Sequence, residues 1–382
     1  MLSFCSFYCG SRTPDRILAA ACSSEDVIEL LPQEALHIEG LRRKLLDNMA
    51  LWGYELVKPP LVEFLDSLLA GSENLDIQTF KITDQASGRL MGVRADLTPQ
   101  IARIDAHRMA GTGTRRFAYC GDVLRTRSES TQPRRNPLIV GAELYGVANV
   151  SGDMEVMGLL LDCMNACGVE QSVLDIGHSA IFAGLVAVHG LSAEDSRTVK
   201  EAISGVQRPT LSQWQTAKRF SAACLADIAF LLDAPLHRAG LADLTQQFGG
   251  RHALFDQAIA DLEAAEAMLR AAYPQQEIVV DVSSIGTYGY HSGLVFALYA
   301  QGHYDALARG GRYDGLGEVY GKARPATGFS IDLLTLGQLL PLPVSAQTAE
   351  KQAWSQNSKI FQDALSKRRS GIAVIFEHEG ES

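Results

Sequence analysis

The order of strand-type and helix-type segments is the feature that most limits how this chain can fold. Apolar runs typical of β-strands follow one another as hairpins, and a block from Ala180 to about Ala272 that is helical in pattern divides them into two groups. Consecutive hairpins form antiparallel sheets, whereas a doubly wound parallel sheet requires strands and helices in regular alternation. The sequence therefore predicts an α+β fold, in which helices flank an antiparallel sheet and residues 180–272 form a helical insertion.

The first group of strands is preceded by a helix. Apolar residues at helical spacing follow Pro32 and end before Gly53. The segment "YELVKPPLVEF" is then typical of a strand that two prolines interrupt, and "TFKITDQASGRLMGV" of a hairpin. Two longer strands, in "RRFAYCGDVLR" and "NPLIVGAELYGVA", are joined by a basic loop from Thr126 to Arg135, which is a natural place to hold an anion.

After the insertion, the sheet is expected to resume. The segments "EIVVDVS" and "GLVFALYA" are typical of strands, as is the run that leads to "ARGGRYDGLG". The segment "TGFSIDLLTLGQLL" is rich in leucine, and we expect it to close the core as a helix.

Composition and charge argue against several classes of protein. The 382 residues carry 34 Lys and Arg against 44 Asp and Glu, a net charge of −10, so no overall positive field attracts nucleic acid. No uninterrupted apolar stretch is long enough for a transmembrane helix, and polar residues break the apolar run near the start. We expect residues 1–25 to be a disordered or mis-started tail and the protein to be cytoplasmic. Cys163 and Cys167 share a helical face without further metal ligands, and we expect two reduced core thiols.

Some polar residues have structural interpretations that need no ligand. Asp96 and Thr98 could cap the helix that begins at Pro99. Arg125 and Glu143 could pair across neighbouring strands, because charges near the centre of a sheet need partners.

Asp105 and His107, in "RIDAHR", could suggest acid-base chemistry. Residues two apart on a helix point in different directions, so the pair is not arranged to act on one substrate. A solvated helix face is the better interpretation.

Several motifs occur in one particular order. "VRADLT" follows the hairpin, "DVLRTR" ends a strand, "GAELYG" lies on the return strand, and "GGRYDGL" precedes "PATGF". This combination resembles the catalytic core of class II aminoacyl-tRNA synthetases, specifically histidyl-tRNA synthetase, from Pro32 to Leu340. The resemblance implies a synthetase-like core at residues 26–340 that contains the helical insertion.

The resemblance implies a histidine-binding site at particular residues. Asp96 and Thr98 match positions that hold the substrate ammonium group, and Glu143 matches another pocket carboxylate. Arg125 matches the motif 2 arginine, whose guanidinium binds the amino acid carboxylate and the α-phosphate of ATP. Ile139 stands where the family has a glutamine.

The rest of the implied pocket comes from two later motifs. Tyr290 and His291 occupy the tyrosine pair that reads the imidazole ring, so one tyrosine is kept and one is replaced by another hydrogen-bonding ring. Gly310 and Gly311, in "GGRYDGL", match a pocket wall where glycines allow close approach of ligand or backbone. No metal and no cofactor are implied.

Positions that serve ATP in the synthetases have changed. Gly286 and Thr335 stand where the family has arginines, and Arg127 replaces the glutamate of R-x-E. Amino acid activation needs positive charge where negative charge develops, and each lost donor costs about 2.7–4 kcal/mol in the barrier. Catalysis as a synthetase is therefore not expected. Arg134 and Arg135 are either a remnant of the ATP-binding loop or a contact for a partner subunit.

The end of the chain is also shorter than in a synthetase. Residues 341–382 allow a short helix and strand, but no full anticodon-binding domain. A core that keeps the amino acid pocket and loses the ATP arginines resembles the regulatory subunits of short-form ATP phosphoribosyltransferase. That resemblance implies a non-catalytic subunit in the first step of L-histidine biosynthesis, which the short catalytic subunit needs for activity and which binds histidine for feedback inhibition.

The same resemblance implies particular partners. We expect a hetero-octamer of four regulatory and four catalytic subunits, a self-dimer through the class II core near Trp52 to Phe64, and neither tRNA nor membrane as a partner. One alternative is a truncated histidyl-tRNA synthetase, or a paralogue that activates histidine with ATP. Another is a scaffold whose pocket is vestigial.

Overall fold

The computed structural model describes residues 26–69, 73–109, 111–127, 134–205, 211–237, 239–285, 291–342, 349–355 and 357–378. The chain divides into two compact units, Met1–Leu340 and Pro341–Ser382. The first unit contains an eight-stranded sheet, and the second contains a two-stranded sheet.

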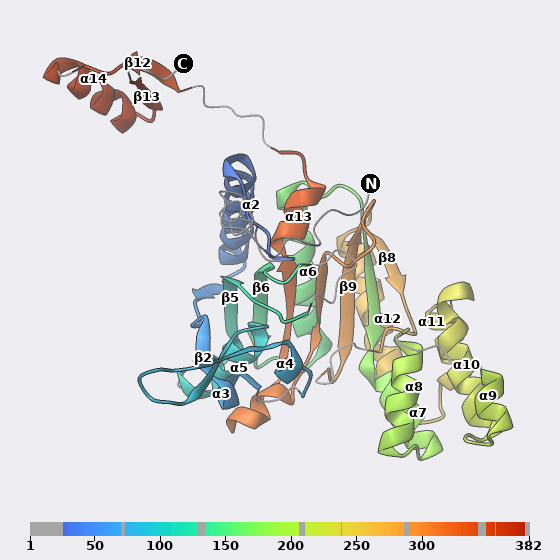
Figure 1. Ribbon diagram of the computed structural model, residues 1–382. Helices are drawn as coiled ribbons and strands as arrows, with labels where there is room; N and C mark the ends of the chain where they lie inside the picture. The colour runs from blue at the N-terminus through green and yellow to red at the C-terminus, as the bar shows by residue number, and fades with distance from the viewer. Residues whose placement is uncertain are drawn as a thin grey trace, which may run out of the picture. The chain divides into compact units, whose positions relative to one another are not determined.

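A single large sheet organises the first unit (Figure 1). Its strands lie in the order β1 (Glu55–Val57), β5 (Arg115–Asp122), β6 (Leu138–Tyr145), β11 (Ala326–Asp332), β10 (Ala308–Arg312), β9 (Leu294–Ala300), β7 (Ser172–His178) and β8 (Glu277–Val280). The interior pairings are antiparallel, and only the edge pairs, β1 with β5 and β7 with β8, are parallel. The predicted α+β class, with a mainly antiparallel sheet, is confirmed.

The segment between β1 and β5 forms a smaller sheet. Its elements are β2 (Val62–Phe64), α3 (Leu65–Leu69), α4 (Glu73–Gln78), β3 (Phe80–Thr83) and β4 (Leu90–Val93). Pro59 and Pro60 separate β1 from β2, and the two strands belong to different sheets, as expected of a strand interrupted by prolines. The predicted hairpin is β3 and β4, and Gly88 N donates to Asp84 O across its turn.

Helices cover one face of the large sheet. They are α2 (Pro32–Leu51), α6 (Val150–Cys167), α12 (Ala253–Ala272) and α13 (Leu333–Leu339). The apolar spacing of α2 is confirmed, because Ile38, Leu41, Leu45 and Met49 are all buried against this face. On β6, Val140, Ala142 and Leu144 point to the same core, and alternate residues point to the opposite face.

The opposite face is covered more sparsely, by α5 (Thr98–His107) and the short 3-10 helix η1 (Leu316–Tyr320). A second apolar cluster fills this interface and includes Ile101, Phe117 and Tyr145. Since α5 and η1 cover only part of this face, the remaining sheet surface is accessible for a pocket.

Six helices lie in the segment predicted as a helical insertion, among the residues that the structure describes. They are α7 (Ser179–His189), α8 (Ala193–Ile203), α9 (Leu211–Thr216), α10 (Ala222–His237), α11 (Leu241–Phe248) and α12. Figure 1 shows α7, α8, α9, α10 and α11 at one end of the large sheet, whereas α12 lies against β7, β8 and β9.

The helix predicted over "TGFSIDLLTLGQLL" is wrong for its first half. Residues Ala326–Asp332 form strand β11, which is hydrogen-bonded to β6 on one side and β10 on the other. Only Leu333–Leu339 is helical, and Asp332 caps it by accepting from the backbone N–H groups of Leu334 and Thr335. These residues form a strand because the unpaired backbone N–H and C=O groups of β6 and β10 require hydrogen-bond partners, and this outweighs the local helical pattern.

The predicted solvated face of α5 is wrong for Asp105. This residue is only 2% exposed, and its carboxylate binds Arg115 Nη1 at 2.5 Å and Arg324 Nη1 at 2.8 Å. His107 is exposed, and its ring lies edge-on to Tyr320. The two residues therefore do point in different directions, but only one of them faces solvent.

The second unit is small. It consists of β12 (Glu350–Ala353), α14 (Ser358–Arg369) and β13 (Val374–Glu377), with β12 parallel to β13. Within the segments that the structure describes, no helix has the length and apolar composition needed to cross a bilayer.

Candidate ligand-binding site

A pocket lies on the sparsely covered face of the large sheet, over β6, β11 and β10. Its empty space, including its open mouth, is about 480 Å³. The residues around it are Asp96, Thr98, Arg125, Ile139, Glu143, His291, Arg309, Gly310, Gly311, Tyr313, Gly328, Phe329 and Ser330. The structure thus brings seven of the residues proposed for the site to one place, although Asp96 and Gly311 are more than 200 positions apart in the sequence. Tyr290 and Gly286 lie outside the described residues.

Glycines form the floor of this pocket. Glu143, Gly328 and Gly311 are directly opposite one another on β6, β11 and β10. A side chain at Gly328 would collide with the Glu143 carboxylate, and one at Gly311 would contact the backbone of Leu294. Gly310 points the other way, where its missing Cβ leaves room for the ring of Phe296. The floor therefore consists of backbone.

Glu143 lies at the closed end of the pocket and is only 1% exposed. Its Oε1 accepts hydrogen bonds from Thr98 Oγ1 at 2.9 Å and Tyr119 OH at 3.0 Å, and its Oε2 accepts one from Tyr313 OH. Burial raises the pKa of Glu143 to about 8, although the three hydroxyl groups oppose this shift. Glu143 is therefore a buried acid whose partners carry no positive charge.

The cross-strand ion pair between Arg125 and Glu143 is not formed. Arg125 Nε donates to Ala95 O at 3.2 Å, and among the described residues this is the only hydrogen bond of its guanidinium. The backbone N–H of Arg125 donates to Arg135 O, which holds the start of the basic loop. The outer nitrogen atoms of Arg125 are left for a ligand.

The predicted cap by Thr98 is also wrong. The N-cap residue of α5 is Leu97, and Thr98 is the first helical residue, with its hydroxyl bonded to Glu143. Asp96 Oδ1 instead accepts from the backbone N–H groups of Leu97 at 2.6 Å and Thr98 at 3.3 Å. One carboxylate oxygen thus fixes the helix start, and Asp96 still lines the pocket.

Arg134 has an internal role. Its Nη1 lies 3.2 Å from Asp332 Oδ2 and 3.2 Å from Thr335 Oγ1, and the residue is 6% exposed. Arg134 therefore binds Asp332 and Thr335 at the start of α13. Arg135 stacks over the ring of Phe80 and donates to Arg125 O.

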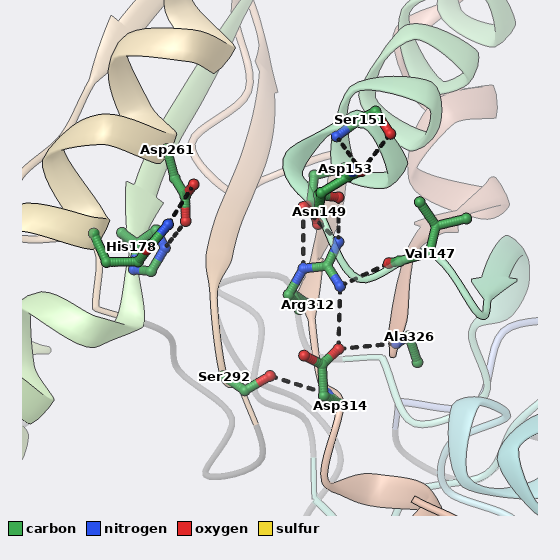
Figure 2. A network of polar contacts seen from close by, with 11 residues as sticks. Val147, Asn149, Ser151, Asp153, His178, Asp261, Ser292, Arg312, Asp314 and Ala326 are labelled. Carbon is green, nitrogen blue, oxygen red and sulfur yellow. Dashed lines mark hydrogen bonds and ion pairs between the residues drawn. The ribbon is translucent and has the colours of Figure 1, made fainter. Parts of the chain in front are cut away.

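A polar network lies behind the pocket (Figure 2). The Arg312 guanidinium donates to Asp153 Oδ2 at 2.7 and 3.1 Å and to the carbonyl oxygens of Val147 and Asn149 at 3.0 Å. Arg312 and Asp153 are 6% and 2% exposed. This pair joins β10 to the start of α6.

The network continues to two pocket residues. Arg312 Nη1 binds Asp314 Oδ1 at 3.2 Å, and the backbone N–H of Asp314 donates to Ser292 Oγ at 2.9 Å. Tyr313 lies between Arg312 and Asp314 in the chain, and Ser292 follows His291. The network thus holds the segments that carry Tyr313 and His291. Burial lowers the pKa of His291 to about 4, so its ring is neutral at pH 7.

Sequence analysis did not assign a site role to Tyr313, Tyr119, Arg309 or Ser330. Tyr313 lies within "GGRYDGL", and the motif itself could have indicated it. Tyr119 could have been found by counting along β5, because it faces the same way as Phe117 on this half of the sheet. Arg309 and Ser330 face each other across β10 and β11, and this register could be seen only in the structure.

The described residues include no group of three or more His, Cys, Asp or Glu side chains placed to hold a metal ion. The pocket instead offers two carboxylates, two guanidinium groups and several hydroxyls around a backbone floor. Such a set suits a small zwitterion with a polar side chain.

Comparisons with known proteins identify the family. A family model described as histidyl-tRNA synthetase matches residues 26–336. The ATP phosphoribosyltransferase regulatory subunit of Polynucleobacter asymbioticus is 39% identical over 358 residues, covering 94% of this chain and 92% of that protein. The regulatory subunit of Alkalilimnicola ehrlichii is 41% identical over 377 residues, covering 94% and 90%. The chain belongs to the family of ATP phosphoribosyltransferase regulatory subunits.

Solved structures agree with this family on the fold. An ATP phosphoribosyltransferase regulatory subunit/histidyl-tRNA synthetase from Bacillus halodurans C matches with a TM-score of 0.80 at 22% identity, covering 95% of this chain and 94% of that one. A histidyl-tRNA synthetase from Nostoc sp. PCC 7120 matches with a TM-score of 0.73 at 16% identity, covering 95% and 87%. At these identities the likeness shows the fold alone, which in this chain is that of class II synthetases.

Proposed function

We propose that this chain is the non-catalytic, histidine-sensing subunit of an ATP phosphoribosyltransferase, the enzyme of the first step of L-histidine biosynthesis. The observation that carries the proposal is Glu143, a buried acid that three hydroxyl groups hold without a cation. A buried carboxylate of this kind is stabilised by a ligand that brings hydrogen-bond donors and positive charge.

Free histidine fits the distribution of groups around the pocket. Its ammonium group would bind Asp96, whose second carboxylate oxygen is not used at the start of α5. Its imidazole ring would lie at the closed end, where Glu143, Tyr313 and His291 meet, with Tyr290 as a further contact. Its carboxylate would bind Arg125 at the open end.

Binding without activation accounts for the residues that differ from the synthetases. Gly286 and Thr335 replace two arginines, and Arg134 contacts Thr335 and Asp332 from the basic loop. The pocket therefore retains groups for an amino acid and lacks the clustered positive charge that the triphosphate of ATP requires.

Regulation would act at a distance. Histidine in this pocket would favour one arrangement of a complex with a short catalytic subunit, which has activity only in that complex. Such coupling is typically ~1–3 kcal/mol and is reciprocal, so substrates of the catalytic subunit should weaken histidine binding by the same factor.

The test is co-expression with a short-form catalytic subunit. We expect phosphoribosyltransferase activity only when both chains are present, inhibition by histidine, and histidine binding by calorimetry to the complex. Asp96→Asn should raise the inhibitory histidine concentration while co-purification persists, and Arg43→Gln, on an exposed part of α2, is the matched control. Absence of histidine binding to both the free chain and the complex would refute the proposal.

Two alternatives give different results in the same preparations. A chain that activates histidine would catalyse histidine-dependent exchange of pyrophosphate into ATP, and we expect none. A scaffold with a vestigial pocket would leave histidine inhibition unchanged by Asp96→Ala, and we expect inhibition to weaken.

A further inference from the structure

A row of residues crosses the large sheet next to the glycine floor. Gly141, Ser330, Arg309, Ala297 and Asp175 are direct neighbours on successive strands, from β6 to β7. Residues directly opposite each other in a sheet face the same side. Because Ser330 and Arg309 line the pocket, the whole row lies on the pocket face.

Arg309 is the long cationic side chain of this row. Ser330 and Ala297, on either side of Arg309, are short, so the Arg309 side chain can lie over these two neighbours, whereas the Tyr119 ring fills the space over Gly141. Its neighbour across Ala297 is Asp175, which is largely buried and has one carboxylate oxygen, Oδ1, that accepts no hydrogen bond from the described residues.

The positive charge of Arg309 acts on two neighbouring groups of the pocket face. Burial raises the pKa of Asp175 to about 7, and the nearby Asp281 raises it further, whereas the positive charge of Arg309 lowers it. Burial also raises the pKa of Tyr299, and both the charge of Arg309 and a hydrogen bond between the two side chains oppose the shift. Arg309 is therefore close enough to both groups to act on their charge.

The position of Arg309 relative to Glu143 matches the size of an amino acid. Glu143 is on β6 and Arg309 is on β10, with β11 between them. Neighbouring strands are ~4.8 Å apart, so β6 and β10 are separated by roughly 10 Å, and Arg309 lies two residues along β10 from Gly311, the residue in line with Glu143. A histidine whose imidazole binds Glu143 would place its carboxylate within reach of the Arg309 side chain.

We propose that Arg309 binds the carboxylate of the amino acid ligand, opposite Arg125, and that Asp175 positions the Arg309 guanidinium. This inference rests on the proposed function and extends it, since it names the residue that distinguishes an amino acid from its decarboxylated amine. The Nε of Arg125 donates to Ala95 O, so Arg125 can bind the ligand carboxylate only through its two outer nitrogen atoms. Two guanidinium groups together clamp a carboxylate from both sides.

The test compares histidine with histamine, which has the same ring and ammonium group but no carboxylate. In calorimetric titrations of the full chain and of its complex with the catalytic subunit, wild type should prefer histidine. Arg309→Gln should weaken histidine binding by on the order of 10- to 100-fold and leave histamine binding unchanged. Arg309→Lys should retain part of the preference, and Asp175→Asn should reduce it by less than Arg309→Gln.

The outcomes separate this inference from the proposed function. A histidine preference that is the same in Arg309→Gln as in wild type overturns the role of Arg309 alone. Wild-type chain and complex that bind no histidine overturn the proposed function, and this inference with it. If Arg309→Gln does not fold, as judged by its thermal unfolding, the histidine preference of Arg309→Lys decides, and an undiminished preference overturns the role.

Discussion

Two buried carboxylates on neighbouring elements of the fold have opposite surroundings. Asp153, at the start of α6, receives two hydrogen bonds from the Arg312 guanidinium and is 2% exposed. Glu143, on β6, is 1% exposed, and the hydrogen bonds that it receives from the described residues all come from hydroxyl groups. Both acids are removed from water, but only Asp153 has a cation beside it.

The difference separates a structural site from a binding site. Arg312 offsets part of the cost of burying Asp153, although burial still raises the pKa of Asp153, so the pair can join β10 to α6 without any ligand. The desolvation of Glu143 is not balanced in this way, which is why its pKa rises to about 8. Burial alone does not indicate function; the absence of a compensating charge at the edge of a pocket does.

Breaking the Asp153 pair should have the largest effect on stability. Arg312→Met leaves a buried carboxylate without its cation, and we expect the free energy of unfolding to fall by about 3–5 kcal/mol. Urea denaturation followed by circular dichroism measures this. The double variant Arg312→Met with Asp153→Leu should recover part of the loss. If the double variant is as unstable as the single one, the stranded carboxylate is not the cause.

A side chain on the pocket floor should have the next largest effect. Gly328→Ala places a methyl group against the Glu143 carboxylate, and overpacking of this kind costs about 1–3 kcal/mol. We also expect loss of detectable histidine binding in calorimetry. The control must be a glycine with a negative φ, which excludes Gly190, whose φ of 61° would strain any other residue. Gly40→Ala, in α2 with nothing near its Cβ, is the matched control and should bind histidine normally.

Replacing Glu143 by a residue that does not titrate should change how the free energy of unfolding depends on pH. In the folded protein this acid is protonated up to pH of about 8, whereas in the unfolded chain it ionises near 4.5, so unfolding releases a proton between these values. This contribution to stability is complete below pH 4.5 and is lost at about 1.4 kcal/mol per pH unit as the pH rises toward 8.

Glu143→Gln should remove that part of the slope. The measurement is the urea midpoint of both proteins from pH 5 to pH 8, with the exposed Glu277→Gln as control. Equal slopes in wild type and Glu143→Gln would show that Glu143 is already ionised in the folded protein, and the contrast with Asp153 would disappear.

The smallest effects on stability and on histidine affinity are expected at Ser292, which lies between the Arg312–Asp153 network and the pocket. Ser292→Ala removes the acceptor for the backbone N–H of Asp314, and a single hydrogen bond contributes about 0.5–1.5 kcal/mol. Because Ser292 is next to His291, we expect histidine affinity to fall about fivefold with little change in the unfolding midpoint. A larger change in stability than in affinity would place Ser292 with the structural site instead.

Much of the fold could be predicted because the relevant patterns are local. The spacing of Ile38, Leu41 and Leu45 defines a helix face, and Pro59 and Pro60 interrupt a strand wherever they occur. Strand β11 could not be predicted in this way. Its residues form a strand because β6 and β10 present open edges on both sides, and those strands lie far away in the sequence.

The same limit applied to the site. The resemblance of motifs indicated Asp96, Thr98 and Glu143, and the structure places all three around one pocket. The partners of each group could not be read from the sequence: Asp105 seemed solvated, yet it binds Arg324, which is 219 residues away. Arg309 has no distinguishing local pattern, and only the register of β10 shows which face it occupies.

The glycine floor affects how much conformational entropy the protein loses when a ligand binds. Gly328 and Gly311 are held by hydrogen bonds on both sides within the sheet, so this surface has almost no freedom left to lose when a ligand arrives. The entropy needed to shape it is spent during folding, and little rearrangement is required at the moment of binding. A ligand that reaches this pocket therefore meets a floor that is already formed.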